Sequence, residues 1–385
     1  MFKDRLTLIA IACSILLAAS AVAGSQSPAG ASKEQDLLDL NSGAMVLSWS
    51  SQYDEEWAAL LLVDDTTKRG WSAGEGAEFP HQFLIELAQP TRLTSIVIDN
   101  SGTLEGDYPG ISAHEIEVWV SNEGPEEGFD KVMTVEARQG ERSAFTLPQS
   151  TPVRWLELKV LSNWGHDRYT ELMEVEGYGE PLDNDTPQPE LAGVYDTNWE
   201  LMRFEQAGNQ VRGCYDFDGG TLTGSTDGRV VQFEWRENGG DEVGTALMVL
   251  SSTGEQLSGL WNYEGEYKGL WIGSPAGPGK QPDCTIPTSN NLSQSLATSG
   301  SAILYGIRFD LGESQLGPES RATLEEARAA LETQPELNLI IEGHTDTTGR
   351  SATNRELSER RAQAVKTWLV DHGIDPERLQ PRGRG

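Results

Sequence analysis

The sequence predicts a multidomain chain in which two β-rich units precede a C-terminal α/β unit. Apolar and polar residues alternate along Phe83–Leu87, Ile116–Val120 and Leu156–Val160, as expected of half-buried strands. Residues 301–385 differ, because strand-like runs there are joined by segments with an apolar stripe of helical period. A chain of 385 residues is long enough for two or three hydrophobic cores.

The N-terminus has the composition of a secretory signal peptide, which we predict over residues 1–23. Lys3 and Arg5 form a basic start. Leu6–Ala19 is apolar but shorter than a membrane span, and the small residues Ala21–Ala23 precede the expected cleavage point. The sequence therefore predicts an exported protein with no transmembrane helix after signal removal.

Acidic residues outnumber basic residues by 60 to 29, which gives a formal net charge of -31. Most of this charge lies in residues 24–300. Such a surface repels nucleic acid and anionic lipid, so neither is an expected partner. A well-solvated exterior accounts for the charge, and divalent cations remain compatible with it.

Residues 33–180 carry the pattern of an all-β sandwich, with turn residues between short strands. The order and spacing of five segments resemble the discoidin or galactose-binding-like jelly roll. These segments are Leu62–Ser72, Gln82–Leu87, Ile116–Ser121, Val153–Leu158 and Glu174–Gly179.

That resemblance implies a sugar site in the loops at one end of the sandwich. The candidates are Tyr108, Trp164, His166 and Tyr169, because an aromatic ring can stack on the apolar face of a sugar. Trp71, Trp119 and Trp155, which lie in strand-like patterns, are expected in the core instead.

The same resemblance implies a structural calcium ion, although the chain needs no other cofactor. Asp64, Asp65 and Glu174 offer the oxygen ligands that calcium prefers, but their spacing is not that of a compact calcium loop.

The middle of the chain, residues 191–287, is predicted to be a β meander similar to small avidin-like or lipocalin-like barrels. Linkers flank it, a proline-rich acidic one at 181–190 and a Ser/Asn/Thr-rich one at 288–300. In an exported chain, Cys214 and Cys284 are expected to form a disulfide; two buried free thiols are the alternative.

A strand, a polar turn and a helix follow one another near the C-terminus. The strand is expected at Leu337–Glu342, the turn at Gly343–Gly349, and the helix begins at Ser351 or Asn354.

That helix has an arginine on its apolar face. Leu357, Val365 and Leu369 define the face, and Arg361 lies near its middle. A buried guanidinium needs a partner, and Asp346 on the preceding turn is the nearest candidate.

The pattern Gly-His-Thr-Asp-x-x-Gly from Gly343, followed by Leu357-Ser358-x-x-Arg361, resembles the OmpA-like peptidoglycan-binding domain. The resemblance implies a βαβαβ arrangement, with a first strand at Ile307–Phe309 and a first helix at Pro318–Thr333. The family pattern continues past the last residue of this sequence, so either the sequence is a fragment or the domain is truncated.

The same resemblance implies a ligand, the diaminopimelate-containing peptide of peptidoglycan. Asp346 and Arg361 match the two ligand-binding positions and would hold the ammonium and carboxylate of diaminopimelate. Asn354, Leu357 and Ser358 would line the site. The alternative is an ion pair between Asp346 and Arg361 that only orders the turn.

The five histidines are scattered, and neither a phosphate loop nor a nucleophile elbow is present, so we do not expect an enzyme. The sequence predicts an adaptor in the periplasm, or associated with the outer membrane, of a Gram-negative bacterium. It would bind peptidoglycan non-covalently and present the sandwich to a glycan or an envelope protein. The alternatives are an accessory subunit of a carbohydrate-active enzyme and a structural envelope spacer.

Overall fold

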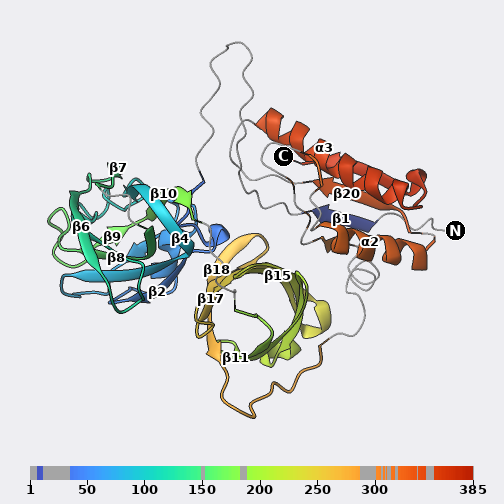
Figure 1. The fold of residues 1–385 in the computed structure, drawn as a ribbon, viewed down its shortest axis with the longest axis horizontal. Helices are drawn as coiled ribbons and strands as arrows, with labels where there is room; N and C mark the ends of the chain where they lie inside the picture. Colours follow the sequence, from blue (N-terminus) through green and yellow to red (C-terminus); the bar gives the residue numbers. More distant parts are fainter. Residues whose placement is uncertain are drawn as a thin grey trace.

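The computed structural model describes residues 7–11, 35–148, 152–182, 189–286 and most of 301–384. Its gaps in the last range are 305–306, 308, 310–313, 317–319, 336 and 344–350. Three units follow one another along the chain: a β-sandwich, a closed barrel and an α/β unit (Figure 1). No helix in the described part of the chain is long and apolar enough to cross a membrane.

The sandwich is organised around its longest strand. Its first half pairs with β2 and β8, and its second half pairs with β10 and β7, so one strand contributes to both layers. β5 and β6 extend the first layer beyond β8. The elements are β2 (Met45–Trp49), β3 (Trp71–Ser72), β4 (His81–Asp99), β5 (Glu115–Ser121), β6 (Asp130–Glu136), β7 (Arg142–Thr146), β8 (Pro152–Val160), β9 (Glu171–Leu172) and β10 (Glu174–Pro181), with short helices η1 (Leu40–Ser42) and η2 (Ala59–Val63).

The core of the sandwich follows the alternation seen in the sequence. Phe83, Ile85 and Leu87 of β4 are buried, and Trp71 packs edge-on against Phe83 with ring centroids 4.7 Å apart. All five residues of η2 are buried as well. The sequence prediction of an N-terminal β-sandwich is therefore confirmed.

The middle unit is a closed barrel of eight antiparallel strands, in which β18 pairs back onto β11. This confirms the predicted meander and small barrel. The strands are β11 (Gly193–Thr197), β12 (Glu200–Ala207), β13 (Gln210–Tyr215), β14 (Thr221–Asp227), β15 (Val230–Glu237), β16 (Glu242–Leu250), β17 (Leu257–Tyr263) and β18 (Glu266–Pro275), with η3 (Phe217–Gly219) and η4 (Asn238–Gly240) in two turns.

Large rings fill the barrel because small residues lie opposite them. Trp235 pairs across the strands with Gly244, and Phe233 pairs with Gly224. A Cβ atom on Gly244 would lie 2.1 Å from Cζ2 of Trp235, so no side chain fits there. Glycine is needed at such positions for space.

A disulfide closes the barrel unit, as the sequence predicted. Cys214 of β13 and Cys284 are joined with an S–S distance of 2.07 Å across a sequence separation of 70 residues. Asp283 next to it donates its backbone N–H to Asp216, which fastens the same segment to the barrel.

A buried ion pair joins the sandwich to the barrel. Arg229 donates to Glu86 at 2.7 Å and to the carbonyl of Gly43 at 3.0 Å, and the Arg229 and Glu86 side chains are each 2% exposed. Ser252 of the barrel donates to the same carboxylate from its backbone N–H at 3.0 Å and from its hydroxyl. Arg154 of the sandwich lies 3.9 Å from it.

Apolar side chains of the barrel complete this junction. Val249, Leu260 and Leu270 project outward from three strands and belong to the same buried cluster as the sandwich core. The two units are thus held together by a shared core as well as by the chain that connects them.

The C-terminal unit packs two helices against a four-stranded parallel sheet, in the order β19-β1-β20-β21 (Figure 1). It touches the barrel where Gln210 donates to Thr323 at 2.9 Å. The elements are β19 (Ser301–Ile303), α2 (Arg321–Thr333), β20 (Leu339–Gly343), α3 (Ser351–Asp371), η6 (Pro376–Arg378) and β21 (Leu379–Gly383).

Two details of this unit differ from the sequence prediction. The first strand lies at Ser301–Ile303, whereas Phe309 of the expected strand makes only an isolated bridge with Leu316. β1 (Thr7–Ile11) pairs in parallel with both β19 and β20, and it comes from the run predicted to be a signal peptide. A chain from which residues 1–23 have been removed would lack β1, so this pairing and the predicted removal of a signal peptide exclude each other in one molecule.

Candidate functional sites

The N-terminal turns of α3 are pressed against the ends of two strands. A Cβ atom on Gly343 would lie 2.2 Å from the carbonyl oxygen of Ser358, and one on Gly383 would lie 2.5 Å from that of Arg355. The Ser358 hydroxyl, which is fully buried, donates to the Arg355 carbonyl at 2.9 Å. The glycine of the Gly-His-Thr-Asp turn is therefore required for close helix packing.

Arg361 points inward from α3, as its place on the apolar stripe predicted. Its side chain is 1% exposed, and its guanidinium lies over the ring of Phe309, 5.1 Å from the centroid. Leu357, one turn earlier, is buried too. The structure therefore places a cation inside the domain, beside an aromatic ring that sequence reasoning had assigned only to a strand.

A carboxylate at the end of β20 forms ion pairs with two arginines. Glu342 is buried and lies 3.4 Å from Arg382 and 2.6 Å from Arg384. Asp346, the predicted counter-ion of Arg361, lies outside the described residues, as does the side chain of Asn354.

Aromatic rings gather in the loops at one end of the sandwich, as predicted from the resemblance. His166 and Tyr169 stack with centroids 5.8 Å apart, and Tyr108 meets both edge-on at 5.9 and 6.3 Å. Tyr53, which sequence reasoning missed, joins them at 5.8 Å from Tyr169. Tyr53 and Tyr108 are 52% and 43% exposed, so this cluster presents ring surface to solvent.

Trp164 belongs to the same end but not to the same cluster. Its ring packs on His114 at 4.2 Å, and its indole N–H donates to the Ala137 carbonyl at 3.1 Å. It is still 42% exposed. The structure thus brings three of the four predicted aromatic residues together and sets Trp164 apart.

Three carboxylates of the sandwich unit are buried with few positive charges or hydrogen-bond donors around them. Both oxygens of Glu174 are buried without a hydrogen-bond partner among the described residues, and burial raises its pKa well above the usual range. Burial also raises the pKa of Asp64 and of Asp36 to about 7, although Arg69 contacts Asp64 at 3.0 Å. Asp36 lies far from the others in sequence and was not predicted.

These carboxylates offer oxygen chemistry for a cation but not an assembled cage. Among the described residues, no three acidic, histidine or cysteine side chains are arranged to hold a metal ion. The orphaned oxygens of Glu174 nevertheless fit a hard cation, because a buried carboxylate with no partner is costly.

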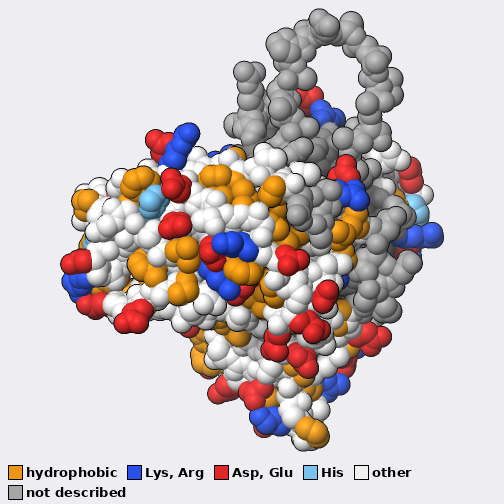
Figure 2. All heavy atoms as spheres, turned by 60° about the vertical axis from the view of Figure 1, so that its left-hand side comes forward, with side chains coloured by type: hydrophobic (Ala, Val, Ile, Leu, Met, Phe, Trp, Pro, Cys, Tyr) orange, Lys and Arg blue, Asp and Glu red, His pale blue; other side chains and the backbone are white. Residues whose placement is uncertain are grey.

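Acidic side chains are spread over the visible face of the sandwich and barrel, with apolar side chains scattered between them (Figure 2). Basic side chains near the middle of this face lie beside acidic ones. The distribution supports the solvated acidic exterior inferred from composition.

Comparisons with known proteins agree with two of these units. Residues 308–385 match the model of the OmpA family, and residues 64–181 match that of the Sad1/UNC-like C-terminal family. The chain therefore carries an OmpA-family domain at its C-terminus behind a discoidin-like sandwich.

Relatives among characterised proteins match the C-terminal part. Outer membrane protein A of Bordetella avium is 34% identical over 107 residues, which are 27% of this chain and 55% of that protein. Outer membrane porin F of Pseudomonas aeruginosa is 35% identical over 80 residues, 20% of this chain and 23% of that protein. The chain thus spans about half, or less, of the length of the relatives that it matches.

Solved structures similar to the chain include two carbohydrate-binding modules. One is CBM32-3 of a family 31 glycoside hydrolase from Clostridium perfringens, with 15% identity, a TM-score of 0.32 and coverage of 37% of this chain and 94% of that one. The other is the family 32 module of Streptococcus pneumoniae EndoD, with 14% identity, a TM-score of 0.32 and coverage of 38% and 100%.

Proposed function

We propose that this protein is an exported envelope adaptor that binds the peptide of peptidoglycan without covalent attachment. The observation that carries the proposal is Arg361, a fully buried guanidinium in the stretch that matches the OmpA family. A buried cation is unfavourable unless an anion compensates it. Asp346 and the carboxylate of diaminopimelate supply that charge in this proposal.

The chemistry of diaminopimelate suits such a pair. Its side-chain end bears an ammonium and a carboxylate, which Asp346 and Arg361 match in sign, and a guanidinium binds a carboxylate through two parallel hydrogen bonds. Asn354, Leu357 and Ser358, at the start of α3, would surround the ligand. The free backbone N–H groups of a helix N-terminus also favour an anion there.

Co-sedimentation with purified wall sacculi tests this function. We expect Asp346→Ala and Arg361→Ala each to lower binding more than tenfold, because losing a charge-assisted contact costs about 2–5 kcal/mol. Glu332→Gln, on an exposed position of α2, is the matched control and should bind like the parent. Thermal unfolding of each variant separates lost binding from lost folding. Variants that stay folded and still pellet with sacculi like the parent contradict the assignment.

We also propose that the sandwich presents its aromatic loop cluster to a glycan. Exposed rings of Tyr53 and Tyr108 offer stacking surface for a sugar. Binding of soluble envelope glycans by the parent, and its loss in Tyr108→Ala, is the measurement. Turnover of wall fragments by the purified protein would instead favour a role in carbohydrate-active enzyme chemistry.

A calcium ion in the sandwich is part of this proposal. Asp64, Asp65 and Glu174 would supply carboxylate oxygens, and the ion would balance the charge that Asp64 and Glu174 bury. It would hold the adjoining chain segments in place and take no part in chemistry.

A further inference from the structure

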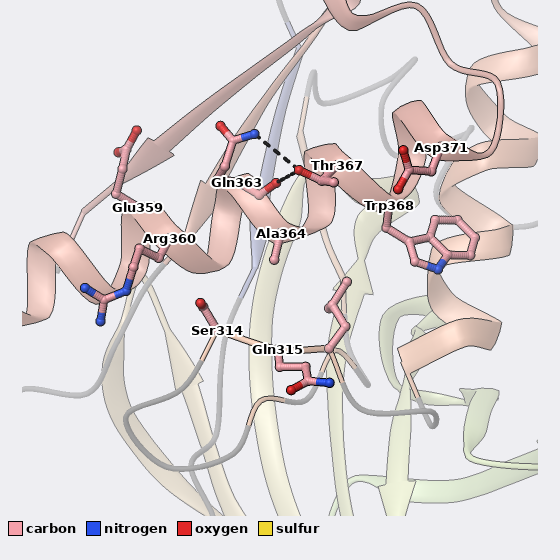
Figure 3. Close-up of a pocket in the computed structure, with 10 residues that line it drawn as sticks. Ser314, Gln315, Glu359, Arg360, Gln363, Ala364, Thr367, Trp368 and Asp371 are labelled. Atoms are coloured by element: carbon pink, nitrogen blue, oxygen red, sulfur yellow. Dashed lines mark hydrogen bonds between the residues drawn. The ribbon is translucent and has the colours of Figure 1, made fainter.

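A pocket of about 610 Å³ opens on the OmpA-family domain, away from the buried face of Arg361. It lies between α3 and the segment Ser314–Leu316, which face each other across it (Figure 3). Its volume is within the range of about 300–1,000 Å³ that is usual for small-ligand sites.

Uncharged polar groups and an apolar floor line much of this pocket. Gln315, Gln363 and Thr367 contribute amides and a hydroxyl, and Leu316 and Ala364 contribute aliphatic surface. The Thr367 hydroxyl donates to the Gln363 carbonyl at 2.9 Å and accepts from the Gln363 amide at 3.4 Å (Figure 3). The lining therefore offers the Gln315 amide and the remaining donors and acceptors of Gln363 and Thr367 to hydroxyl and acetamido groups, together with contacts for the apolar face of a ring.

An indole completes the lining. Trp368 is half-buried, and its ring stacks on His372 with centroids 3.7 Å apart and planes 12° apart. His372 is itself tied to the carbonyl of Trp368 through Nδ1 at 2.7 Å. The indole is therefore held in a fixed orientation before a ligand arrives, which lowers the entropic cost of stacking.

Charged groups in the lining do not create a site for a charged ligand. Arg360 pairs with Glu356 at 2.9 Å, and the carboxylate of Glu359 accepts the backbone N–H of Gly383. Asp371 adds one negative charge. A cation paired within its own helix and two carboxylates disfavour an anionic ligand such as a phosphate or nucleotide.

The pocket adjoins the proposed peptide site along α3. Glu359 and Arg360 both line the pocket. Glu359 directly follows Ser358 in sequence, and Arg360 directly precedes Arg361. Neighbouring residues of a helix point about 100° apart, so the two sites occupy adjacent sides of one helix. A ligand that carries a peptide and a sugar could therefore occupy both.

We propose that this pocket binds an N-acetylated amino sugar of the wall glycan, next to the peptide held at Arg361. The inference rests on the proposed function and extends it from the peptide to the sugar that bears it. The amide and hydroxyl groups of the lining, the positioned indole and the adjacency to Arg361 together favour this ligand over a free anion or an apolar chain.

The test compares two ligands on the full exported chain by titration calorimetry. One is a disaccharide-peptide released from sacculi, and the other is the same peptide without sugar. We expect the parent to bind the sugar-bearing ligand at least about tenfold more tightly. The double variant Gln315→Ala, Thr367→Ala should lose about tenfold for that ligand and keep its affinity for the bare peptide. Trp368→Ala should act in the same direction, but it is more prone to misfold, which is why the polar double variant is the primary test.

The outcomes separate this inference from the function on which it rests. Equal affinity of the parent for both ligands overturns the sugar site and leaves peptide binding intact. A double variant that weakens both ligands by the same factor overturns it too. If neither ligand binds the parent, the proposed function fails and the sugar site fails with it.

Discussion

At the residue scale, Glu174 shows most clearly what burial does to a charged group. It starts β10, its side chain is almost completely enclosed, and Asp64, Asp36, Asp39 and Asp65 all raise its pKa further after burial itself. A buried carboxylate is usually stabilised by a hydrogen-bonded water or by an arginine. The nearby Arg69 forms its ion pair with Asp64 instead. A divalent cation would compensate it more fully.

Replacing this carboxylate should separate its two roles. We expect Glu174→Gln to abolish stabilisation by calcium, because it removes a carboxylate ligand. It should also remove the loss of stability that the metal-free sandwich suffers as rising pH ionises this carboxyl, whose pKa burial raises. In the parent, millimolar calcium should raise the melting temperature above that in chelator. Melting curves of both proteins with and without calcium provide the measurement.

Glu180→Gln is the matched control, because Glu180 lies on the same strand with a side chain that is 77% exposed. It should leave the calcium response unchanged. An equal response to calcium in the parent and Glu174→Gln would rule out this ligand.

How far the sequence predicts these sites depends on the distance between their residues along the chain. Arg361 could be recognised because its apolar neighbours recur at helical spacing around it. Tyr53 could not, because its partner Tyr169 comes from a loop more than a hundred residues later. Asp36 was missed for the same reason: the backbone N–H of Gly177, which it accepts, belongs to the last strand of the sandwich.

At the scale of elements, the barrel depends on glycines that accommodate aromatic rings. Gly244 lies beneath Trp235, and the backbone carbonyl of Asn262 approaches it from the next strand.

The alternation of apolar and polar residues predicted the strands of the barrel, but its closure depends on the pairing of β11 with β18. That pairing joins distant segments, and no local sequence pattern specifies it. The first strand of the C-terminal unit was expected at Ile307–Phe309, but it lies at Ser301–Ile303, and Ile307 and Phe309 pack in the core of this unit.

Adding one methyl group at position 244 should therefore destabilise the barrel. We expect Gly244→Ala to lower the free energy of unfolding by at least about 2 kcal/mol, since its Cβ would overlap the Trp235 ring and main-chain atoms. Chemical denaturation followed by tryptophan fluorescence measures this.

Gly277→Ala provides the control, because no atom lies within 4 Å of the added group and its backbone conformation suits alanine. It should change stability by less than about 0.5 kcal/mol. Similar losses in the two variants would show that packing under Trp235 is not the cause.

At the scale of the whole molecule, the sandwich and barrel form one unit because charge and apolar surface are buried between them. Removing Arg229 leaves Glu86 in the junction with a weaker contact to Arg154. We expect Arg229→Ala to cost about 3–5 kcal/mol of apparent stability and to let the two units unfold at different denaturant concentrations.

Arg212→Ala tests the specificity of that effect. Arg212 is an exposed arginine of the barrel that pairs with Glu205, and its loss should cost no more than about 1 kcal/mol. Separate near-ultraviolet circular dichroism and fluorescence transitions in Arg229→Ala, against one shared transition in the parent, are the expected signature. A single unshifted transition would contradict the role of the ion pair.

In the proposed role, with the C-terminal domain bound to the cell wall, the Cys214–Cys284 bond has a mechanical consequence. A pull from the anchor reaches the barrel through the chain after Cys284 and passes across the sulfur bridge to β13. Strands β14 to β18 lie between the two cysteines, so they are outside the path of tension and cannot be peeled away one by one. Arg229, Val249, Leu260 and Leu270, which hold the sandwich, all lie within this sheltered stretch. The contact between the two units can therefore survive a load that would otherwise strip the last strand first.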